Sequence, residues 1–534
     1  MTSGPVVVVG AGPTGVTTAL ALAAHGVPTV VLERRVEVHP LPRAVHLDDE
    51  AVRVLQSIGV GPAFTAISRP GRGLRLLDAQ LRTMAEFTRG AGRYGHPQAN
   101  LFDQPDLERV LRTELARRPE AGLRTGVEVL GVEPVDGGAV VRLQDLTTGH
   151  VEHLRTPAVL GCDGAASLVR DVVGARWQDL RSTERWLVVD VRCPVPLGHW
   201  EGVHQVCSPV RAATFLRVGV DRYRWEFQLH DGERADDLVR PEVLQALVGP
   251  WTGGLAPDRL EVLRSSEYVF RARLADRWRR GRVLLVGDAA HQTPPFVGQG
   301  LGAGVRDAGN LAWKLAAVLR GEAPEELLDS YERERRPHVR TLIRLARTAG
   351  WAMTGGGGRG AAARRAGLAG LCRLPGASRL LDRGTPPLVG GPLVPRRDPL
   401  AGTLSPQPTV DDGRLLDDVL GPGAVVLTTA AVDPQLLAVA DMLRARLVRV
   451  DGRRLIADDG LVVADDGTIS RWLRAARVRT VVVRPDRVVL LSDRSDLRPG
   501  ASIAGRHGAV LRLVGAQPVS LPAGAPRGAG PRRR

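Results

Sequence analysis

The chain has 534 residues, of which 43% are hydrophobic and 25% charged, which suggests two or three structural units with a large buried core. A net charge of +15 could indicate a nucleic-acid partner, but the arginines are spread along the chain and Lys314 is the only lysine, so no basic patch is expected. Because no apolar stretch approaches the about 18 residues of a membrane helix and no signal-like start is present, we expect a cytoplasmic protein without a membrane partner.

Metal and thiol chemistry are also not expected. The four cysteines form no CxxC pair, so neither a zinc site nor a thioredoxin-type redox motif is predicted. The twelve histidines show no ligand spacing either, and we expect no metal.

The first elements form a βαβ unit around a glycine-rich turn. Residues 6–9 (VVVV) are typical of a buried strand, residues 14–25 of a helix packed on a sheet, and residues 29–32 of the next strand. Between them, Gly10 allows a tight turn, Gly12 lets a pyrophosphate approach the backbone, and Gly15 lets helix and strand pack closely. Glu33 ends the second strand, where a carboxylate can bind a ribose diol.

This arrangement predicts a dinucleotide site, although a tight turn without a ligand is the alternative. The GxGxxG pattern alone is weak, since residues 355–360 (GGGGRG) also match it but follow no strand and are expected to be a flexible loop. The pattern does not choose between NAD and FAD.

Farther along the chain the pattern changes twice. Residues 176–275 contain short runs of alternating character and predict an antiparallel sheet inserted into the first fold. Residues 282–286 predict a return to a buried parallel strand, followed by helices near 307–320 and 324–348. Residues 354–367 and 384–402 are expected to be loop and linker, and 403–515 a separate unit with strands at 423–428 and 480–484 and a helix near 434–446.

Two further segments could bind the same ligand. Residues 161–170 (GCDGAASLVR) follow an apolar strand, and residues 281–315 run from a strand into Gly287 and Asp288. Asp288 is placed to accept a hydrogen bond from a ribityl hydroxyl, and Pro294 and Pro295 stiffen the next turn. The glycines that follow would let backbone approach a planar ring at a helix N-terminus, which could stabilise negative charge on a reduced flavin.

These three segments, in this order and spacing, resemble the class A flavoprotein monooxygenases of the p-hydroxybenzoate hydroxylase type, and the resemblance covers about residues 1–350. Other segments look like the subgroup of 3-(3-hydroxyphenyl)propionate, phenol and polyketide hydroxylases. They are residues 43–50 (RAVHLDDE), 100–108 (NLFDQPDLE), 186–191 (WLVVDV), 224–227 (RWEF) and 293–296 (TPPF).

The resemblance implies an α/β protein with a Rossmann-like FAD-binding domain, residues 1–175 and 276–395. It further implies a β-sheet substrate domain at 176–275, a thioredoxin-like domain at 403–515 and a flexible tail at 516–534. Residues 403–515 contain no cysteine, so packing or oligomer contacts are expected there. A homodimer is a possible assembly.

The activity implied is hydroxylation of a phenolic or polyketide substrate with O2 and NADPH or NADH through a flavin C4a-hydroperoxide. Arg43 would lie near the flavin and nicotinamide, and His46 and Asp48 are candidates for handling a substrate proton. Gln104 would contact the ribityl or phosphate region. The full set of residues expected to bind FAD is Gly10, Gly12, Pro13, Gly15, Glu33, Arg34, Arg43, Gln104, Asp163, Gly287, Asp288, Pro295, Gly298, Gly300, Leu301 and Gly302.

Purely structural roles remain open as alternatives for several of these residues. Arg43 could form a surface salt bridge, Gln104 could cap a helix and Asp163 could be a plain turn residue. Gly302 departs from the family, in which many members have Asn.

Other functions also remain. A dehydrogenase would leave the second and third segments unexplained, and a halogenase would need a Trp-x-Trp-x-Ile-Pro segment that is missing. Epoxidation, Baeyer–Villiger oxidation and a non-catalytic flavin-binding role stay open.

Overall fold

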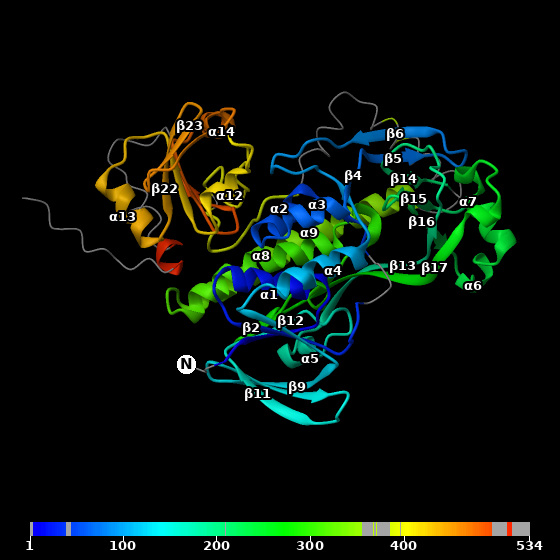
Figure 1. The fold of residues 1–534 in the computed structure, drawn as a ribbon, viewed down its shortest axis with the longest axis horizontal. Coiled ribbons are helices and arrows are strands. Elements are labelled where there is room, and N and C mark those ends of the chain that lie inside the picture. The colour runs from blue at the N-terminus through cyan, green and yellow to red at the C-terminus, as the bar shows by residue number, and fades with distance from the viewer. Residues whose placement is uncertain are drawn as a thin grey trace, which may run out of the picture.

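The computed structural model describes residues 4–38, 44–208, 210–354, 385–395, 397–493 and 510–514, together with residues 367 and 370. Arg43 and the second glycine-rich stretch, residues 355–360, lie outside the described residues. Figure 1 shows the N-terminal elements in the middle of the molecule, with the C-terminal region and a large sheet on opposite sides.

A mostly parallel sheet forms the centre of the N-terminal part. Its strand order is β18-β19-β12-β1-β2-β8. The strands are β1 (Val6–Val9), β2 (Thr29–Glu33), β8 (Ala121–Thr125), β12 (Val159–Gly161), β18 (Arg279–Arg280) and β19 (Val283–Leu285). With helix α1 (Pro13–Ala24) between β1 and β2, the predicted βαβ unit is confirmed.

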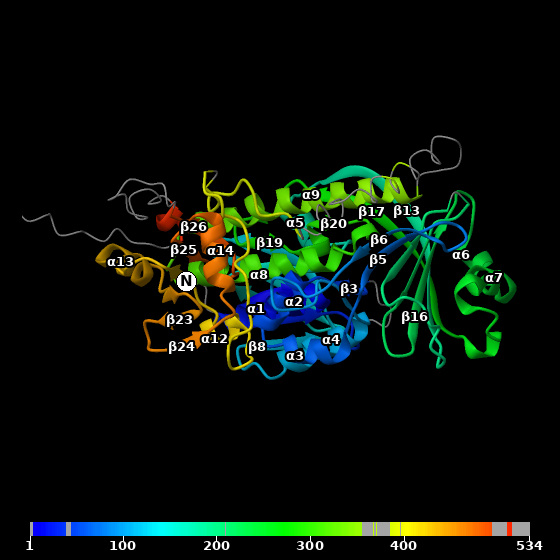
Figure 2. The ribbon, with the colours of Figure 1, turned by 90° about the horizontal axis from the view of Figure 1, so that it is seen from above.

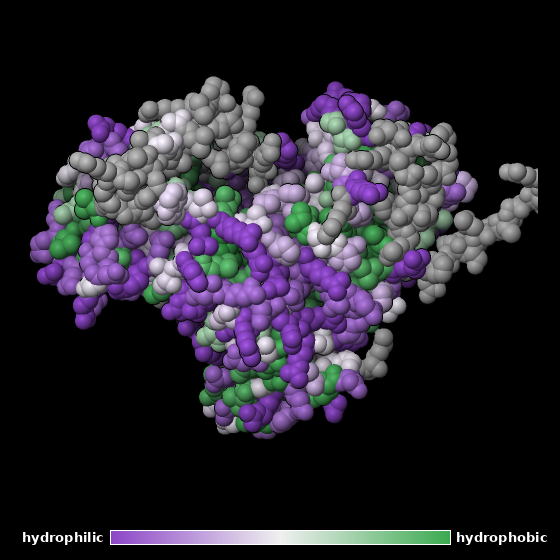
Figure 3. Space-filling model, turned by 180° about the vertical axis from the view of Figure 1, so that it is seen from behind, coloured by the Kyte–Doolittle hydropathy of each residue, from purple (hydrophilic) through white to green (hydrophobic). Residues whose placement is uncertain are grey.

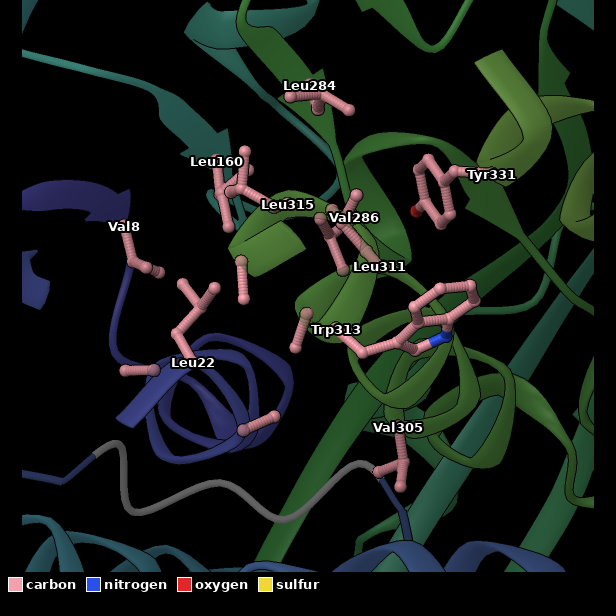
Figure 4. Close-up of a cluster of buried hydrophobic side chains, with 14 of the residues drawn as sticks. Val8, Leu22, Leu160, Leu284, Val286, Val305, Leu311, Trp313, Leu315 and Tyr331 are labelled. Carbon is pink, nitrogen blue, oxygen red and sulfur yellow. The ribbon is translucent and has the colours of Figure 1, made fainter. Parts of the chain in front are cut away.

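The core of this part lies between the sheet and two helices. Figure 4 shows Val8, Leu160 and Leu284 of three adjacent strands on one side, with Leu22 of α1 and Leu311 of α8 (Gly300–Leu319) among the side chains that meet them. All five side chains are fully buried. Burial of so many aliphatic groups at about 25 cal/mol per Å² fixes α1 and α8 against the strands.

Helix α8 begins at Gly300, seven residues before the predicted start near 307. Glycines weaken a helix in sequence-based reasoning. Here, however, a side chain at Gly304 would collide with Thr14 of α1, so close packing of the two helices needs glycine at this position.

Several smaller elements complete the N-terminal part. They are helices α2 (Asp49–Ser57), α3 (Gly61–Ile67), α4 (Gln104–Leu115), α5 (Leu168–Val173) and α9 (Asp329–Thr354), the antiparallel sheet β9 (Val127–Val135), β10 (Gly138–Asp145) and β11 (Val151–Thr156), and the small sheet β3 (His46–Leu47), β7 (Asn100–Leu101) and β4 (Arg69–Pro70).

A second large sheet has eight strands, in the order β20-β17-β13-β16-β15-β14-β5-β6. Its strands are β5 (Gly73–Leu77), β6 (Thr83–Thr88), β13 (Trp177–Arg192), β14 (Val203–Val206), β15 (Ala213–Arg217), β16 (Arg222–Leu229), β17 (Glu261–Ala275) and β20 (His291–Gln292). The sheet therefore also takes in residues 73–88, and β5 pairs with β14 in parallel. Helices α6 (Ala235–Leu238) and α7 (Pro241–Thr252) belong to the apolar cluster on one of its faces.

The C-terminal region, residues 397–493, has its own sheet and core. Strand order is β24-β23-β22-β21-β25-β26. Its elements are α12 (Leu416–Leu420), β21 (Val425–Thr428), α13 (Pro434–Met442), β22 (Arg446–Asp451), β23 (Arg454–Ala457), β24 (Val462–Ala464), α14 (Thr468–Ala476), β25 (Thr480–Val483) and β26 (Val489–Ser492). Figure 2 shows α8 running between this region and the eight-stranded sheet.

Among the described residues, none of the helices is both long enough and apolar enough to cross a membrane. The face seen in Figure 3 mixes hydrophilic and hydrophobic residues over all parts of the molecule.

Candidate active site

A single continuous cavity of about 1710 Å³ runs from the glycine-rich turn after β1 to the inner face of the eight-stranded sheet. Ligand pockets commonly measure roughly 300–1,000 Å³, so this one can hold more than one ligand. Many residues expected to bind FAD line it, namely Gly10, Gly12, Pro13, Glu33, Arg34, Gln104, Asp163, Asp288, Pro295, Gly298, Gly300 and Leu301. His46 and Asp48 line it as well.

The glycines of the first turn have different surroundings. Gly10 has a φ of +98°, and a side chain there would meet the carbonyl of Cys162 at 2.7 Å. A side chain at Gly15 would collide with the carbonyl of Gly10. Around Gly12, by contrast, no protein atom lies within 4 Å of the position of a Cβ. Gly10 and Gly15 are thus required by the turn itself, whereas the space at Gly12 opens into the cavity.

Glu33 lies next to this turn. Its carboxylate accepts a hydrogen bond from the backbone N–H of Ala11 at 2.8 Å and another from Arg35 at 2.9 Å. These bonds hold the carboxylate at the cavity wall beside the N-terminus of α1. That helix end offers backbone N–H groups and partial positive charge to a pyrophosphate.

The segment after β19 is fixed from behind by a buried carboxylate. Asp307 of α8 accepts hydrogen bonds from the Gly287 backbone N–H at 3.1 Å, from His291 at 2.7 Å and from Arg335 at 2.8 Å. All of these side chains are buried. Because Gly287 is held in this way, the next residue, Asp288, stands in the cavity wall. Sequence reasoning did not single out Asp307.

Asp163 caps a helix as well as lining the cavity. Its carboxylate accepts hydrogen bonds from the Ser167 hydroxyl at 2.6 Å and from the Val169 backbone at 3.1 Å, at the start of α5. Burial raises the pKa of this carboxyl group.

Asp48 joins the N-termini of α2 and α8. It caps α2 by accepting from the Ala51 N–H at 3.0 Å, and it also accepts from Gln299 and forms an ion pair with buried Arg306. Burial alone would raise the pKa of Asp48, but the Arg306 guanidinium holds it below its usual range. An ionised carboxylate with this many donors suits positioning better than proton transfer.

His46 stands at the turn that precedes α8. A side chain at Gly298, whose φ is +61°, would come within 3.1 Å of His46 Nδ1. That nitrogen is buried and hydrogen-bonds to no group in the described part of the chain. Burial lowers the pKa of His46, so the imidazole is neutral at physiological pH.

Gln104 lies in the cavity wall, whereas Gly302 does not. The Gln104 side chain accepts from the Ala44 N–H at 2.8 Å and donates to Glu108 at 2.8 Å. Gly302 lies behind the lining, because a side chain there would face Arg306 and Ala51 rather than the cavity. Gly15 and Gly287 also lie behind it.

The opposite wall is the face of the eight-stranded sheet. It is mostly apolar, with Trp186 in edge-to-face contact with Phe296 at 5.8 Å between ring centroids. On β14, β15 and β16 the polar side chains that interrupt it are Gln205, Thr214 and Glu226, and β17 adds Glu267, Tyr268 and Arg271 to the lining. Alternation along a strand predicts which residues share a face, but it does not say which face meets a cavity, so Gln205, Thr214 and Glu226 were missed.

This donor set fits FAD. A backbone turn without side chains lies at one end of the cavity beside Glu33, and the glycine-lined start of α8, where nothing lies within 4 Å of a Cβ at Gly300, can receive a planar ring farther along.

Comparison with known proteins agrees with this fit. Residues 3–346 match the family model described as FAD binding domain, and residues 402–498 match the one described as HcaD C-terminal domain. The chain belongs to the FAD binding domain family.

The chain is 35% identical over 512 residues to the 3-(3-hydroxy-phenyl)propionate/3-hydroxycinnamic acid hydroxylase of Burkholderia cenocepacia (strain HI2424), with 91% of this chain and 93% of that protein covered. It is 33% identical over 531 residues to a protein of Rhodococcus jostii (strain RHA1) named "Probable NADH-specific resorcinol 4-hydroxylase", with 97% and 96% covered. The crystal structure of a ternary complex of aklavinone-11 hydroxylase with FAD and aklavinone is similar, with a TM-score of 0.76, 26% identity and coverage of 96% and 99%.

These findings confirm the predicted resemblance, the FAD cofactor and the class of flavin-dependent monooxygenase. The relatives are named as hydroxylases, which does not favour epoxidation or Baeyer–Villiger oxidation.

Proposed function

We propose that this protein hydroxylates a phenolic ring, using NADH or NADPH and O2. The observation that carries this proposal is the continuity of the cavity, which joins the dinucleotide turn and the start of α8 to a separate wall of aromatic and polar side chains. One ligand can thus lie along Gly12 and Gly300 while a second lies against Trp186.

The chemistry supplied by bound FAD is oxidation of the nicotinamide and transfer of one oxygen atom of O2 to the ring. The protein's own contribution is binding and positioning. The N-terminus of α1 would hold the pyrophosphate, Glu33 the ribose, and Asp288 the ribityl chain. The N-terminus of α8 would stabilise negative charge on the ring system, and the apolar sheet wall would exclude water.

Two residues near the ring have different proposed roles. Asp48, ionised and bonded to Arg306, would fix the start of α8 relative to α2. His46, neutral and buried beside Gly298, offers an imidazole that can hydrogen-bond to a ligand at the start of α8. For Arg43, which lies outside the described residues, a role near the nicotinamide stays a prediction.

The substrate is proposed to be a phenol or a larger phenolic polycycle. The cavity volume supports a large substrate, and the similar proteins carry names that refer to a hydroxyphenylpropionate, to resorcinol and to aklavinone.

We also propose that the C-terminal region is thioredoxin-like. Strands β21 and β22 are parallel with α13 between them, β25 is antiparallel to β21, and β26 is antiparallel to β25. This is the strand pattern expected of that fold, and with no cysteine the region would serve packing. The cytoplasm, as a source of NADH, is the proposed location, and a homodimer stays a prediction that light scattering can test.

The purified protein should show flavin absorbance bands and should oxidise NADH or NADPH faster when a suitable phenol is added. The panel should include 3-(3-hydroxyphenyl)propionate, resorcinol and a dihydroxyanthraquinone, with mass spectrometry for a product heavier by one oxygen. Nicotinamide oxidation that yields only hydrogen peroxide with every phenol would contradict the proposal.

A further inference from the structure

Three polar side chains form a row across the sheet wall of the cavity. In the strand register, Gln205 of β14 is opposite Thr214 of β15, and Thr214 is opposite Glu226 of β16. All three line the cavity. Because facing residues in adjacent strands have Cβ atoms about 5 Å apart, the row is a compact polar patch across β14, β15 and β16.

The carboxylate of Glu226 has one ion-pair partner among the described residues, Arg224, and that contact is long. It hydrogen-bonds to no residue in the described part of the chain, and its nearest cation is Arg224, with 4.0 Å between Nη1 and Oε1. The Arg224 guanidinium holds Asp190 instead, with two bonds of 2.7 and 3.0 Å. The side chain of Glu226 is only 12% exposed. A buried carboxylate without hydrogen bonds is costly, so a ligand that donates to it would be strongly favoured.

Thr214 is oriented to accept beside this carboxylate. Its hydroxyl donates to Gln205 Oε1 at 3.0 Å, and the Gln205 amide donates to the Ala213 carbonyl at 3.2 Å. With its proton committed to Gln205, the Thr214 oxygen keeps lone pairs for a donor in the cavity. Glu226 and Thr214 therefore present two acceptors, which match a hydroxyl-bearing ligand.

The patch lies on the same wall as the aromatic contact between Trp186 and Phe296. Val188 of β13 is opposite Glu226, and Trp186, two residues along and on the same face, packs against Phe296. Phe296 precedes Gly298 and the start of α8. A ring held against Trp186 would thus extend between the start of α8 and Glu226.

We propose that Glu226 accepts the proton of the substrate's phenolic hydroxyl and that Thr214 accepts a hydrogen bond from a second hydroxyl or from the same group before transfer. The inference rests on the proposed function. In this step the O–H bond of the phenol breaks, its proton forms a bond to a Glu226 carboxylate oxygen, and the electron pair stays on the substrate oxygen. The resulting phenolate is richer in electrons and accepts an electrophilic oxygen more readily.

The charges around Glu226 affect its titration. Arg224 faces it from its own strand, Asp190 from β13, and Arg264 and Tyr268 stand on β17. Burial raises the pKa of Glu226, with Asp190 acting in the same direction and Arg224 opposing it. A raised pKa makes the carboxylate a better base.

The test compares Glu226→Gln, Glu226→Asp and Thr214→Val holoenzymes with wild type. Glu86→Gln is the matched control, because Glu86 is an exposed residue on β6 of the same sheet, paired with Arg75 at 2.7 Å. The probes are resorcinol and 3-(3-hydroxyphenyl)propionate, each beside its methyl ether. Binding is followed by the change in flavin absorbance, and turnover by product formed per NADH across pH 6–9.

We expect Glu226→Gln to keep FAD and phenol-independent NADH oxidation, while product formation falls about 100-fold or more and its rise with pH disappears. Wild type should bind each phenol roughly 10-fold more tightly than its ether, and Glu226→Gln should lose this preference. Glu226→Asp should recover part of the activity, Thr214→Val should lose less, and Glu86→Gln should match wild type.

Wild-type turnover with an unchanged pH profile in Glu226→Gln, or equal binding of phenol and ether by wild type, would overturn the assignment. A wild-type protein that does not bind FAD, or that does not oxidise NADH, would instead contradict the proposed function.

Discussion

Two regions of this molecule that contain buried polar groups differ in how those groups are satisfied. Where α8 and α9 meet the C-terminal region, Glu334 accepts from Lys314 at 2.9 Å and from Arg484 at 2.9 and 3.1 Å, and Asn310 bonds to both Lys314 and Glu334. We call this set the seam. In the cavity, by contrast, Glu226 and His46 Nδ1 have no hydrogen-bond partner in the described part of the chain.

This difference distinguishes polar groups that stabilise the fold from polar groups that bind a ligand. Each seam residue is paired with a side chain from another part of the protein, so its removal should lower the free energy of unfolding. A polar atom in the cavity wall that has no hydrogen-bond partner in the protein is positioned to bond to a ligand, so its removal should weaken ligand binding.

Glu334→Ala should be the most destabilising change, because it leaves Lys314 and Arg484 buried without their shared carboxylate. We expect a loss of about 3–5 kcal/mol in the free energy of unfolding, measured by urea denaturation with saturating FAD. Glu322→Ala is the control, since Glu322 forms exposed pairs with Arg320 and Arg444 and should change stability by less than about 1 kcal/mol. Equal effects of the two variants would contradict the structural role of the seam.

Gly12→Ala should have the opposite signature. A Cβ there meets no protein atom and the residue has a φ of −67°, so the fold should keep its stability. The added methyl would stand where a pyrophosphate must approach, and we expect FAD affinity to fall roughly 10–100-fold, the equivalent of about 1–3 kcal/mol of overpacking. Gly249→Ala in α7, also with open space, should leave FAD binding unchanged. Unaltered FAD affinity in Gly12→Ala, by fluorescence titration, would place the cofactor elsewhere.

Sequence reasoning succeeded where the determinants are local. The turn at Gly10 and Gly15, the strand before it and Glu33 lie within about thirty residues, and the principle that links them to a dinucleotide is backbone geometry. Long-range pairing was harder. Nothing in residues 73–88 indicates that β5 pairs with β14, because the alternation of a strand does not name its neighbour.

Side-chain roles were harder still. Asp48 was selected as a candidate for proton handling, yet the ion pair that lowers its pKa is made with Arg306, far away in the sequence. Glu226 lies in a segment that resembles the hydroxylases, but its lack of a hydrogen-bond partner emerges only when Arg224 is seen to bind Asp190.

Arg53→Met tests whether the cavity is independent of a second buried contact with the C-terminal region. Arg53 of α2 bonds to Asp417 at 2.6 and 2.9 Å and to the Ser405 carbonyl at 2.6 Å. Asp417 would keep Arg487 at 3.4 Å, so we expect a smaller loss, about 1–3 kcal/mol, with FAD affinity unchanged. Since α2 also begins at the cavity, a matching fall in FAD affinity would show that the C-terminal region shapes the site and would break the comparison.

Asp49→Asn should give the smallest effect, and one that depends on pH. Asp49 lines the cavity, and burial together with Asp48 and Glu50 raises its pKa to about 7. A carboxyl group whose pKa is raised in the folded state contributes stability that is complete below its unfolded value and is lost as pH rises through 7. Asparagine does not titrate, so Asp49→Asn should have the same free energy of unfolding as wild type near pH 4. The variant should then become more stable than wild type as the pH rises to 8. There it should be more stable by about 1 kcal/mol in denaturant unfolding. A difference that stays constant over this range would mean that Asp49 is satisfied like the seam residues and that the division between the two regions fails at this position.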